Sequence, residues 1–252
     1  MQFDTVIFDM DGTVLNTLAD LTNAINYAME RCDHRHDFMQ EEVKYFVGSG
    51  VATAILRALA YESHVALNDL EQIGRFSKDE TSFFLNNREE VQRILSIFRP
   101  YYAKHCHDET TAYPGIRDLL LVLQKRGIPT AVVSNKPDNE VHVLSETYFS
   151  GLFSFCIGEQ DGIPKKPAPD MIFRAFDVLS PKDKNNAVYV GDSEVDLECA
   201  ARASLPMIGV AWGFRGREFL MQHGAKCIAE NPDELLSLLI DPSIPNEKNQ
   251  NS

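Results

Sequence analysis

Short apolar runs alternate along most of this chain with longer stretches of helical periodicity, and this alternation limits the fold more than any other feature. Most of the runs are continuously apolar, which is typical of strands buried on both faces of a parallel sheet. Repeated strand–helix units predict an α/β fold with a doubly wound parallel sheet. The expected strands are residues 5–9, 129–134, 155–158, 187–192, 207–211 and 226–229. The expected helices among them are residues 116–126, 139–149, 169–179, 195–203, 217–223 and 233–239.

Residues 17–107 interrupt this alternation, since they show helical periodicity and no convincing strand. Apolar spacing predicts two inner helix faces, one with Leu18, Leu21, Ile25 and Ala28 and another with Val51, Ile55, Leu56 and Leu59. A stretch of about 90 residues is too long for an ordinary crossover connection, so extra helices packed on the sheet are the weaker interpretation. We expect a smaller α-helical domain, called here the helical insert, and an α/β core of residues 1–16 and 108–240. The polar tail at residues 241–252 is expected to be disordered.

The formal net charge of −13 argues against a general binder of nucleic acid or of anionic membranes, because both need a basic surface. A local basic pocket for a small anionic substrate remains compatible with it. No segment approaches the roughly 20 apolar residues of a membrane span, and the first residues lack the pattern of a signal peptide. The five cysteines are scattered and odd in number, which favours free thiols in a reducing compartment. A cytoplasmic protein is expected, and the sequence predicts no oligomeric state.

Polar residues follow the expected strands at the edge where sites form in open α/β sheets. In chain order they are Asp9 and Asp11, Ser134 and Asn135, Lys165 and Lys166, and Asp192 and Asp196. Taken singly, the hydroxyl, amide and ammonium groups are more typical of turns, helix caps and solvated loops. Because these residues follow successive strands, a shared site is the better interpretation.

Asp9 and Asp11 project to the same side if the strand direction persists, and Asp192 and Asp196 can share a helix face. Each close pair of carboxylates costs roughly 4 kcal/mol at about 4 Å with an effective dielectric constant of ~20, and a bound cation relieves that cost. Oxygen ligands without a well-placed His or Cys indicate Mg²⁺ rather than zinc. Carboxylates, Mg²⁺, a lysine and hydroxyls together describe a phosphoryl site. One acid can attack phosphorus while the other, its pKa raised by like charge, moves protons.

Four sequence elements in this order resemble the motifs of the haloacid dehalogenase-like phosphatase superfamily. They are Asp9-Met10-Asp11-Gly12-Thr13, Ser134-Asn135, Lys166-Pro167 and Gly191-Asp192-Ser193 with Asp196. The resemblance extends to about residue 239. It implies a Rossmannoid α/β core, an inserted α-helical cap domain at residues 17–107, a Mg²⁺ cofactor and an aspartyl-phosphate intermediate.

The resemblance also implies roles for the matching residues. Asp9 becomes the nucleophile and a metal ligand, and Asp11 the acid and base whose backbone carbonyl contacts the metal. Ser134 is expected to hold the phosphoryl group and Lys166 to offset its charge. Position 165, where many relatives have Gly, is Lys165 here, so the choice between the two lysines stays open although Lys166 aligns better. The other expected residues are the metal ligands Asp192 and Asp196, the latter through water or as an orienting group, and the substrate-binding Thr13 and Asn135.

Further segments are similar to the phosphoglycolate phosphatase subfamily. They are Val47-Gly48-Ser49-Gly50, Arg57-Ala58-Leu59, Tyr113-Pro114-Gly115-Ile116, Ser134-Asn135-Lys136 and Trp212-Gly213-Phe214-Arg215. Gly48 and Arg57 are thereby expected to bind substrate, with a helix-surface charge as an equal alternative for Arg57. The resemblance implies a Mg²⁺-dependent phosphatase of a small phosphorylated metabolite, with 2-phosphoglycolate as the leading candidate. Pyrophosphatases, nucleotidases and sugar-phosphate mutases of the superfamily are the alternatives, and a phosphoacceptor signalling domain is the alternative from another class.

Overall fold

A six-stranded parallel sheet forms the centre of the molecule. The computed structural model describes residues 3–74, 80–181, 183 and 186–241, and the tail at residues 242–252 lies outside the described residues. The sheet has the strand order β5-β4-β1-β6-β7-β8. Its strands are β1 (Thr5–Phe8), β4 (Thr130–Pro137), β5 (Phe155–Glu159), β6 (Ala187–Gly191), β7 (Met207–Val210) and β8 (Ile228–Ala229). The predicted parallel α/β sheet and its six strands are therefore confirmed.

The strand β4 continues beyond its expected end. Ser134 and Asn135, which are also typical of a helix cap, remain in the strand, and the pairing with β5 shifts register between Val133 and Pro137. The next helix begins only at Asp138. This extension carries Lys136 past the end of the neighbouring strand β1, toward the helical insert.

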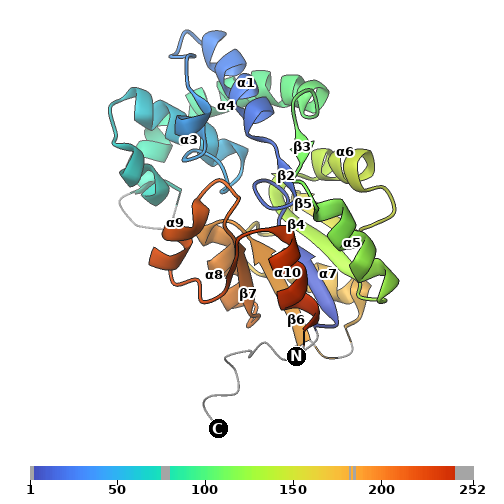
Figure 1. Cartoon of the computed structure of the whole chain (residues 1–252). Coiled ribbons are helices and arrows are strands. Elements are labelled where there is room, and N and C mark those ends of the chain that lie inside the picture. Colours follow the sequence, from blue (N-terminus) through green and yellow to red (C-terminus); the bar gives the residue numbers. More distant parts are fainter. Residues whose placement is uncertain (1–2, 75–79, 182, 184–185, 242–252) are drawn as a thin grey trace.

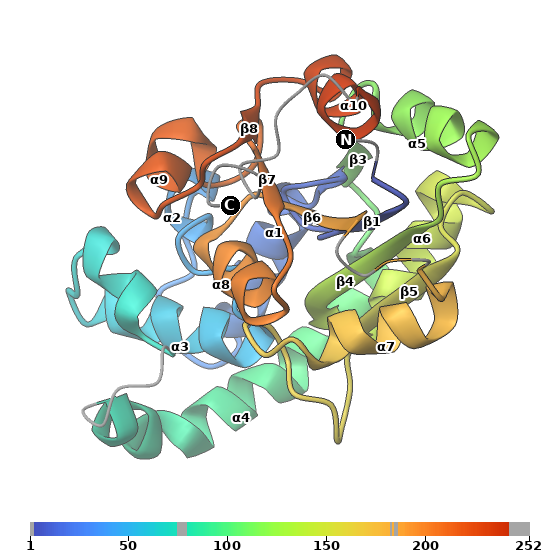
Figure 2. The same cartoon turned by 90° about the horizontal axis from the view of Figure 1, so that it is seen from below.

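Helices cover both faces of the sheet, as the doubly wound pattern predicts (Figure 2). Ile7 of β1 packs with Met171 and Cys199 on the face of α7 and α8, whereas Val6 and Phe8 belong to the core cluster of the opposite face, with α5, α6 and α10. A short helix, α9, packs on β7. The helices are α5 (Ile116–Lys125), α6 (Asp138–Phe149), α7 (Asp170–Leu179), α8 (Glu194–Arg202), α9 (Gly216–Gln222) and α10 (Pro232–Ile240).

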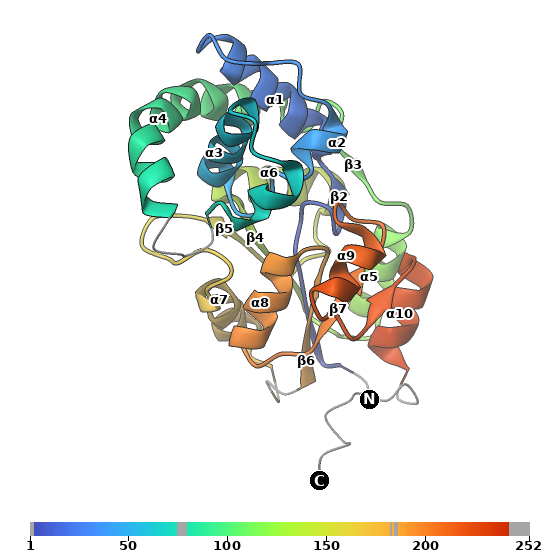
Figure 3. The ribbon, with the colours of Figure 1, turned by 90° about the vertical axis from the view of Figure 1, so that its left-hand side faces the viewer.

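The helical insert lies beyond the carboxyl ends of the strands (Figures 1 and 3). Helix α1 packs against α4 and α2, and α3 packs against α4. The predicted inner faces are confirmed, because Leu21, Ile25, Ile55 and Leu59 are buried. The insert contains α1 (Leu18–Glu30), α2 (Gln40–Val43), α3 (Val51–Glu62), a 3₁₀ helix (Leu67–Gln72) and α4 (Glu80–His105).

Two very short strands join the insert to the sheet. Strands β2 (Leu15–Asn16) and β3 (Thr111–Ala112) pair antiparallel, so the chain enters and leaves the insert through one ribbon. Two residues are too few for a period of two to be read from the sequence, and neither strand was expected. Within the described residues, no helix combines the length and the apolar character that crossing a membrane requires.

Candidate active site

The carboxyl ends of β1, β4 and β6 meet at one point of the sheet, because β1 lies between the other two strands. Strands β4 and β5 lie on one side of β1, and β6, β7 and β8 lie on the other. The strand order thus reverses at β1, and ligands of open α/β sheets bind at such a switch point. Asp9 directly follows β1 and Asp192 directly follows β6, and the last residues of β4 lie beside them.

Three buried carboxylates lie at this point. One oxygen from each of Asp9, Asp192 and Asp196 lies within 4.8 Å of the others. Burial raises the pKa of Asp9 to about 7; Lys166 opposes this rise, and the charges of Asp196 and Asp11 add to it. Burial also raises the pKa of Asp192 well above its ordinary value, with further contributions from Asp196 and Asp9. A set of buried oxygen donors that repel one another fits Mg²⁺, because a divalent cation removes the repulsion.

Lys166 is the cation that reaches this cluster. Its Nζ lies 2.7 Å from Asp9 Oδ1 and 2.7 Å from Asp196 Oδ1, and its side chain is 2% exposed. Burial works to lower the pKa of Lys166, but the two carboxylates outweigh it and raise this pKa above the ordinary value. Lys165 lies elsewhere, with its Nζ close to Gly50 in the helical insert. Of the two lysines left open by the sequence, Lys166 is the one beside Asp9.

Asp196 is held by the start of helix α8. Its Oδ2 accepts hydrogen bonds from Ser193 N at 3.1 Å and Ser193 Oγ at 2.6 Å. Its Oδ1 accepts from Lys166 Nζ and, at 3.1 Å, from the Tyr189 hydroxyl. The capping arrangement and the site are therefore one structure: the acid that caps α8 also faces Asp9. With both oxygens engaged, Asp196 is placed to orient its neighbours.

Asp192 lies against glycines that admit no side chain. A Cβ at Gly12 would lie 2.3 Å from Asp192 Oδ2, and a Cβ at Gly213 would lie 2.2 Å from Asp192 Cβ. Phe214 N donates a hydrogen bond to Asp192 Oδ2 at 2.7 Å. Thr13 is buried, and its hydroxyl is 3.4 Å from Asp192 Oδ1. Thr13 is thus beside the carboxylate cluster, but it does not line the cavity that lies between the strand ends and the helical insert.

Asp11 points away from this cluster, toward the helical insert. Its Oδ1 accepts a hydrogen bond from the Thr17 hydroxyl at 2.7 Å and lies 3.1 Å from Lys136 Nζ. Lys136 Nζ in turn lies 2.5 Å from the hydroxyl of Tyr102 on α4. Burial works to lower the pKa of Lys136, but Asp11 and Tyr102 outweigh it and raise this pKa. The two acids of the first motif therefore have different partners, Lys166 for Asp9 and Lys136 for Asp11.

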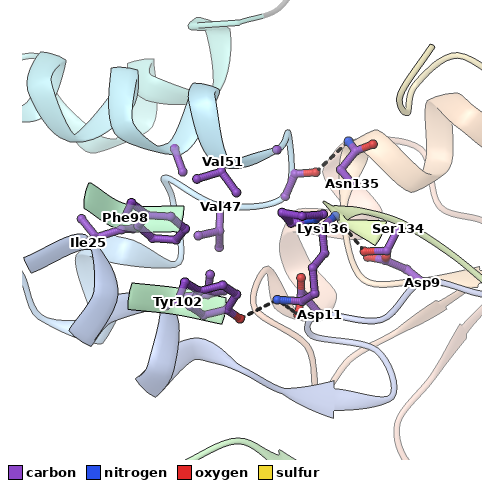
Figure 4. A pocket seen from close by; sticks show the side chains of 15 residues that line it. Asp9, Asp11, Ile25, Val47, Val51, Phe98, Tyr102, Ser134, Asn135 and Lys136 are labelled. Atoms are coloured by element: carbon purple, nitrogen blue, oxygen red, sulfur yellow. Dashed lines mark hydrogen bonds and ion pairs between the residues drawn. The ribbon is translucent and has the colours of Figure 1, made fainter. Parts of the chain in front are cut away.

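A cavity lies between the strand ends and the helical insert (Figure 4). Asp9, Asp11, Ser134, Asn135 and Lys136 line it from the core. The insert contributes mostly apolar walls, namely Leu21, Ile25, Val47, Gly48, Gly50, Val51, Ala54, Phe98 and Tyr102. Asp9 and Asp11 thus face one space together with the Ser134 hydroxyl.

Asn135 ties three segments together at the edge of this cavity. Its Nδ2 donates to Lys166 O at 2.9 Å and to Gly48 O at 3.2 Å, and its Oδ1 accepts from Lys166 N at 2.8 Å. Asn135 thereby fixes the backbone of Lys166 and docks the loop of the insert on the core. Gly48, with φ of 103°, presents its carbonyl in a conformation that favours glycine.

Known proteins resemble this chain in sequence. The sequence pattern of a family described as "Haloacid dehalogenase-like hydrolase" matches residues 6–210. The chain belongs to this family. It is 30% identical over 228 residues to a phosphoglycolate phosphatase of Pseudomonas syringae pv. tomato. This match covers 90% of this chain and 74% of that protein. It is 27% identical over 248 residues to the Escherichia coli K12 phosphoglycolate phosphatase, covering 98% and 95% of the two chains.

A solved structure gives a stronger likeness. The crystal structure of a protein from Lactobacillus delbrueckii subsp. bulgaricus, provisionally named phosphoglycolate phosphatase, superposes with a TM-score of 0.90. The two sequences are 45% identical, and the match covers 96% of this chain and 100% of the other. This haloacid dehalogenase-like chain is thus a member of the phosphoglycolate phosphatase-like subfamily.

Arg57 is not brought to the site of this hydrolase. It is 0% exposed, so the alternative of a helix-surface charge is wrong. Its guanidinium donates to the carbonyls of Ile73 at 3.1 Å and Phe46 at 3.2 Å and to the hydroxyl of Ser49 at 3.2 Å. Arg57 does not line the cavity, so its expected role in substrate binding stays a prediction. Its position corrects the surface interpretation, because the buried side chain organises the backbone of the loop at residues 45–49.

Sequence reasoning missed two side chains of this site, Lys136 and Tyr102, and also Arg215, which bonds to the carbonyl of Val47 beside it. Lys136 and Arg215 stood in the motifs that carried the family resemblance, but no chemistry was assigned to them. Tyr102 could not be singled out, because one aromatic residue in a long helix is ordinarily a core residue. Its contact with Lys136 depends on how the insert sits on the sheet.

Proposed function

We propose that this phosphoric monoester hydrolase uses Mg²⁺ and an aspartyl-phosphate intermediate to hydrolyse a small phosphomonoester, with 2-phosphoglycolate as the leading substrate. The observation that carries the proposal is the position of Asp9, which lines the cavity 2.7 Å from Lys166 and beside two further buried carboxylates. The curated relatives in Pseudomonas and Escherichia bear the name phosphoglycolate phosphatase, and this supports the choice of substrate.

In the first step, an Asp9 oxygen forms a bond to phosphorus while the bond from phosphorus to the leaving oxygen breaks. Asp11 donates its proton to that leaving oxygen. The two described side-chain contacts of Asp11 both involve Oδ1, and Asp11 lines the cavity. In the second step, Asp11 takes a proton from water, the water oxygen bonds to phosphorus, and the bond to Asp9 breaks to release phosphate. Ser134 and Lys166 hold the phosphoryl oxygens through both steps.

A Mg²⁺ ion would be held by carboxylate oxygens of Asp9 and Asp192, with Asp196 orienting the set. The ion would offset the negative charge that gathers on the phosphoryl oxygens. Thr13 and Asn135 act through their neighbours, since Thr13 contacts Asp192 and Asn135 fixes the backbone of Lys166.

The helical insert, residues 17–107, acts as a cap over the core formed by residues 1–16 and 108–240. The cavity between the two parts, the single ribbon of β2 and β3 and the docking of Gly48 on Asn135 support this division. The proposal also includes the cytoplasm as the compartment, because all five cysteines are free thiols.

The test is phosphate release with Mg²⁺ from 2-phosphoglycolate, pyrophosphate, nucleoside monophosphates and hexose phosphates, compared by kcat/KM. Asp9→Asn is expected to abolish turnover of every substrate while circular dichroism shows an intact fold. Asp118→Asn, at an exposed carboxylate on α5, is the matched control and should keep full activity. A preference for pyrophosphate or a hexose phosphate would retain the mechanism and reject 2-phosphoglycolate, whereas turnover by Asp9→Asn would reject the mechanism.

Metal dependence is tested separately. EDTA should stop phosphate release, and added Mg²⁺ should restore it. Titration calorimetry should detect Mg²⁺ binding to the wild type and its loss in Asp192→Asn. Activity that survives EDTA, or equal Mg²⁺ binding by both proteins, would contradict the assignment of the carboxylate cluster.

A further inference from the structure

The cavity has an uneven distribution of polar groups that bears on the substrate. Its floor, from the core, presents carboxylates, a hydroxyl and an ammonium group, whereas Leu21, Ile25, Val51 and Phe98 of the insert form apolar walls (Figure 4). Among the described residues that line the cavity, Lys136 alone carries a positive charge. A substrate group that lies against the apolar walls would lose its hydrogen bonds to water without replacement.

Lys136 is arranged so that it can bind a ligand. Its ammonium group contacts the Tyr102 hydroxyl at 2.5 Å and Asp11 Oδ1 at 3.1 Å. An ammonium group has three donors, so within the described structure one donor is left over for an acceptor in the cavity. Tyr102 is 1% exposed and comes from α4 of the insert, so the insert itself holds the ammonium group in place.

The position of Asp11 fixes which part of the substrate lies beside Lys136. Asp11 must meet the leaving oxygen to give it a proton, and Lys136 Nζ is 3.1 Å from the same carboxylate. An acceptor only a few bonds from the leaving oxygen therefore falls within reach of Nζ. We propose that Lys136, held by the Tyr102 hydroxyl, binds a carboxylate bonded directly to the ester carbon and so determines substrate specificity. This inference rests on the proposed phosphatase function.

The competing explanation is that Lys136 only neutralises Asp11. The two explanations differ in what they predict for a substrate without a carboxylate. If Lys136 acts on Asp11 alone, its removal weakens the hydrolysis of every phosphomonoester by the same factor. If Lys136 binds the carboxylate, its removal weakens the hydrolysis of carboxylate-bearing substrates more than that of others.

The experiment compares 2-phosphoglycolate with ethyl phosphate, in which a methyl group replaces the carboxylate. The measured quantity is the ratio of the two kcat/KM values, with Mg²⁺ present. Lys136→Met is expected to lower this ratio by roughly 10- to 100-fold, the scale of a hydrogen bond between charged groups. Tyr102→Phe should lower it by about 5-fold, because Lys136 keeps its charge but loses the hydroxyl that positions it. Lys136→Arg, which keeps the charge, should retain a higher ratio than Lys136→Met.

Two variants on α4 serve as matched controls. Lys104→Met removes an exposed charge, and Tyr101→Phe removes the hydroxyl of a ring that stacks on Tyr27 instead of lining the cavity. Both should keep the wild-type ratio. If Lys136→Met fails to fold, the ratios measured for Tyr102→Phe and Lys136→Arg decide between the two explanations.

An unchanged ratio in all Lys136 and Tyr102 variants would overturn the inference. So would a wild type that hydrolyses both esters with equal kcat/KM, although the proposed phosphatase function would then stand. A wild type that hydrolyses neither ester nor any other phosphomonoester would overturn both.

Discussion

Arg215 Nη2 donates a hydrogen bond to the carbonyl oxygen of Val47 at 3.1 Å, and this bond joins the core to the helical insert. Arg215 immediately precedes α9, and Val47 belongs to the loop before α3. The same guanidinium donates to the carbonyl of Lys44 and pairs with Glu194 at 3.2 Å. Because Val47 lines the cavity and is next to Gly48, Arg215 holds the loop that closes one side of the site.

Arg215→Lys should therefore raise KM more than it lowers kcat. A lysine keeps the charge opposite Glu194 but has no planar fork to reach two carbonyls at once. We expect kcat/KM for 2-phosphoglycolate to fall by roughly 10-fold or more, the scale of one lost hydrogen bond from a charged donor. Arg217→Lys, whose guanidinium pairs with Glu230 at the surface, is the control. Steady-state kinetics identical in wild type and Arg215→Lys would show that the loop is held by other contacts.

A second prediction concerns Gly213, which packs on the carboxylate cluster. A Cβ there would lie 2.6 Å from both Asp192 Oδ2 and the carbonyl oxygen of Gly12, closer than real Cβ atoms approach. Gly213→Ala should displace Asp192 and weaken Mg²⁺ binding by about 10-fold or more, as changes around metal ligands do. Gly209→Ala, in strand β7, is the control, because its Cβ would meet the flexible end of the Leu220 side chain of α9 at 3.0 Å. Titration calorimetry measures the Mg²⁺ affinity of both variants and the wild type. Equal Mg²⁺ affinity of Gly213→Ala and the wild type would refute the steric argument.

The sequence predicted the sheet and the carboxylate cluster because both follow from local patterns. An apolar run that ends in an acid places that acid at a strand end, and the topology of parallel strands then brings Asp9 and Asp192 together. Lys166 was the better-aligned of two candidates, and its contact with Asp9 follows from the loop that Asn135 fixes. Periodicity was enough to place Asp9 and Asp192 at strand ends, whereas the preference for Lys166 over Lys165 rested on the family resemblance.

The contacts between core and insert could not be predicted in this way. Whether Arg57 points outward, into the cavity or into its own domain depends on the packing of the loop at residues 45–49 around it. The contacts of Tyr102 with Lys136 and of Arg215 with Val47 join residues 34 and 168 positions apart. No helical or strand period extends across such separations.

Arg57 gives a third prediction, because its burial makes it a stability residue. Arg57→Met would leave carbonyls of Phe46 and Ile73 without their donor and should lower the free energy of unfolding by about 3 kcal/mol. Denaturant unfolding measures this change. Arg31→Met, at a half-exposed guanidinium, is the control and should cost less than about 0.5 kcal/mol. A variant with unchanged stability but a raised KM for 2-phosphoglycolate would instead support the substrate-binding role expected from the sequence.

The last prediction concerns the pH dependence of stability at Glu42 in α2. Burial works to raise the pKa of Glu42, but hydrogen bonds from Met39 N, the Tyr61 hydroxyl and Arg35 outweigh it and hold this pKa below the ordinary value of 4.5. The ionised form is therefore favoured by folding. The contribution of ionised Glu42 to the free energy of unfolding is complete above pH 4.5, and it is lost as the pH falls through the lower pKa of the folded state.

Glu42→Gln removes that contribution, so the variant should be less stable than the wild type by about 1–3 kcal/mol at pH 7. The difference between the two proteins should shrink as the pH is lowered below 4.5, because the wild-type side chain then takes up a proton. Denaturant unfolding from pH 7 to pH 3.5 measures both. Glu41→Gln, at the adjacent exposed side chain, should stay within about 0.5 kcal/mol of the wild type throughout. A difference at Glu42 that grows toward low pH would mean that folding favours the protonated acid, the opposite of what its three hydrogen-bond donors require.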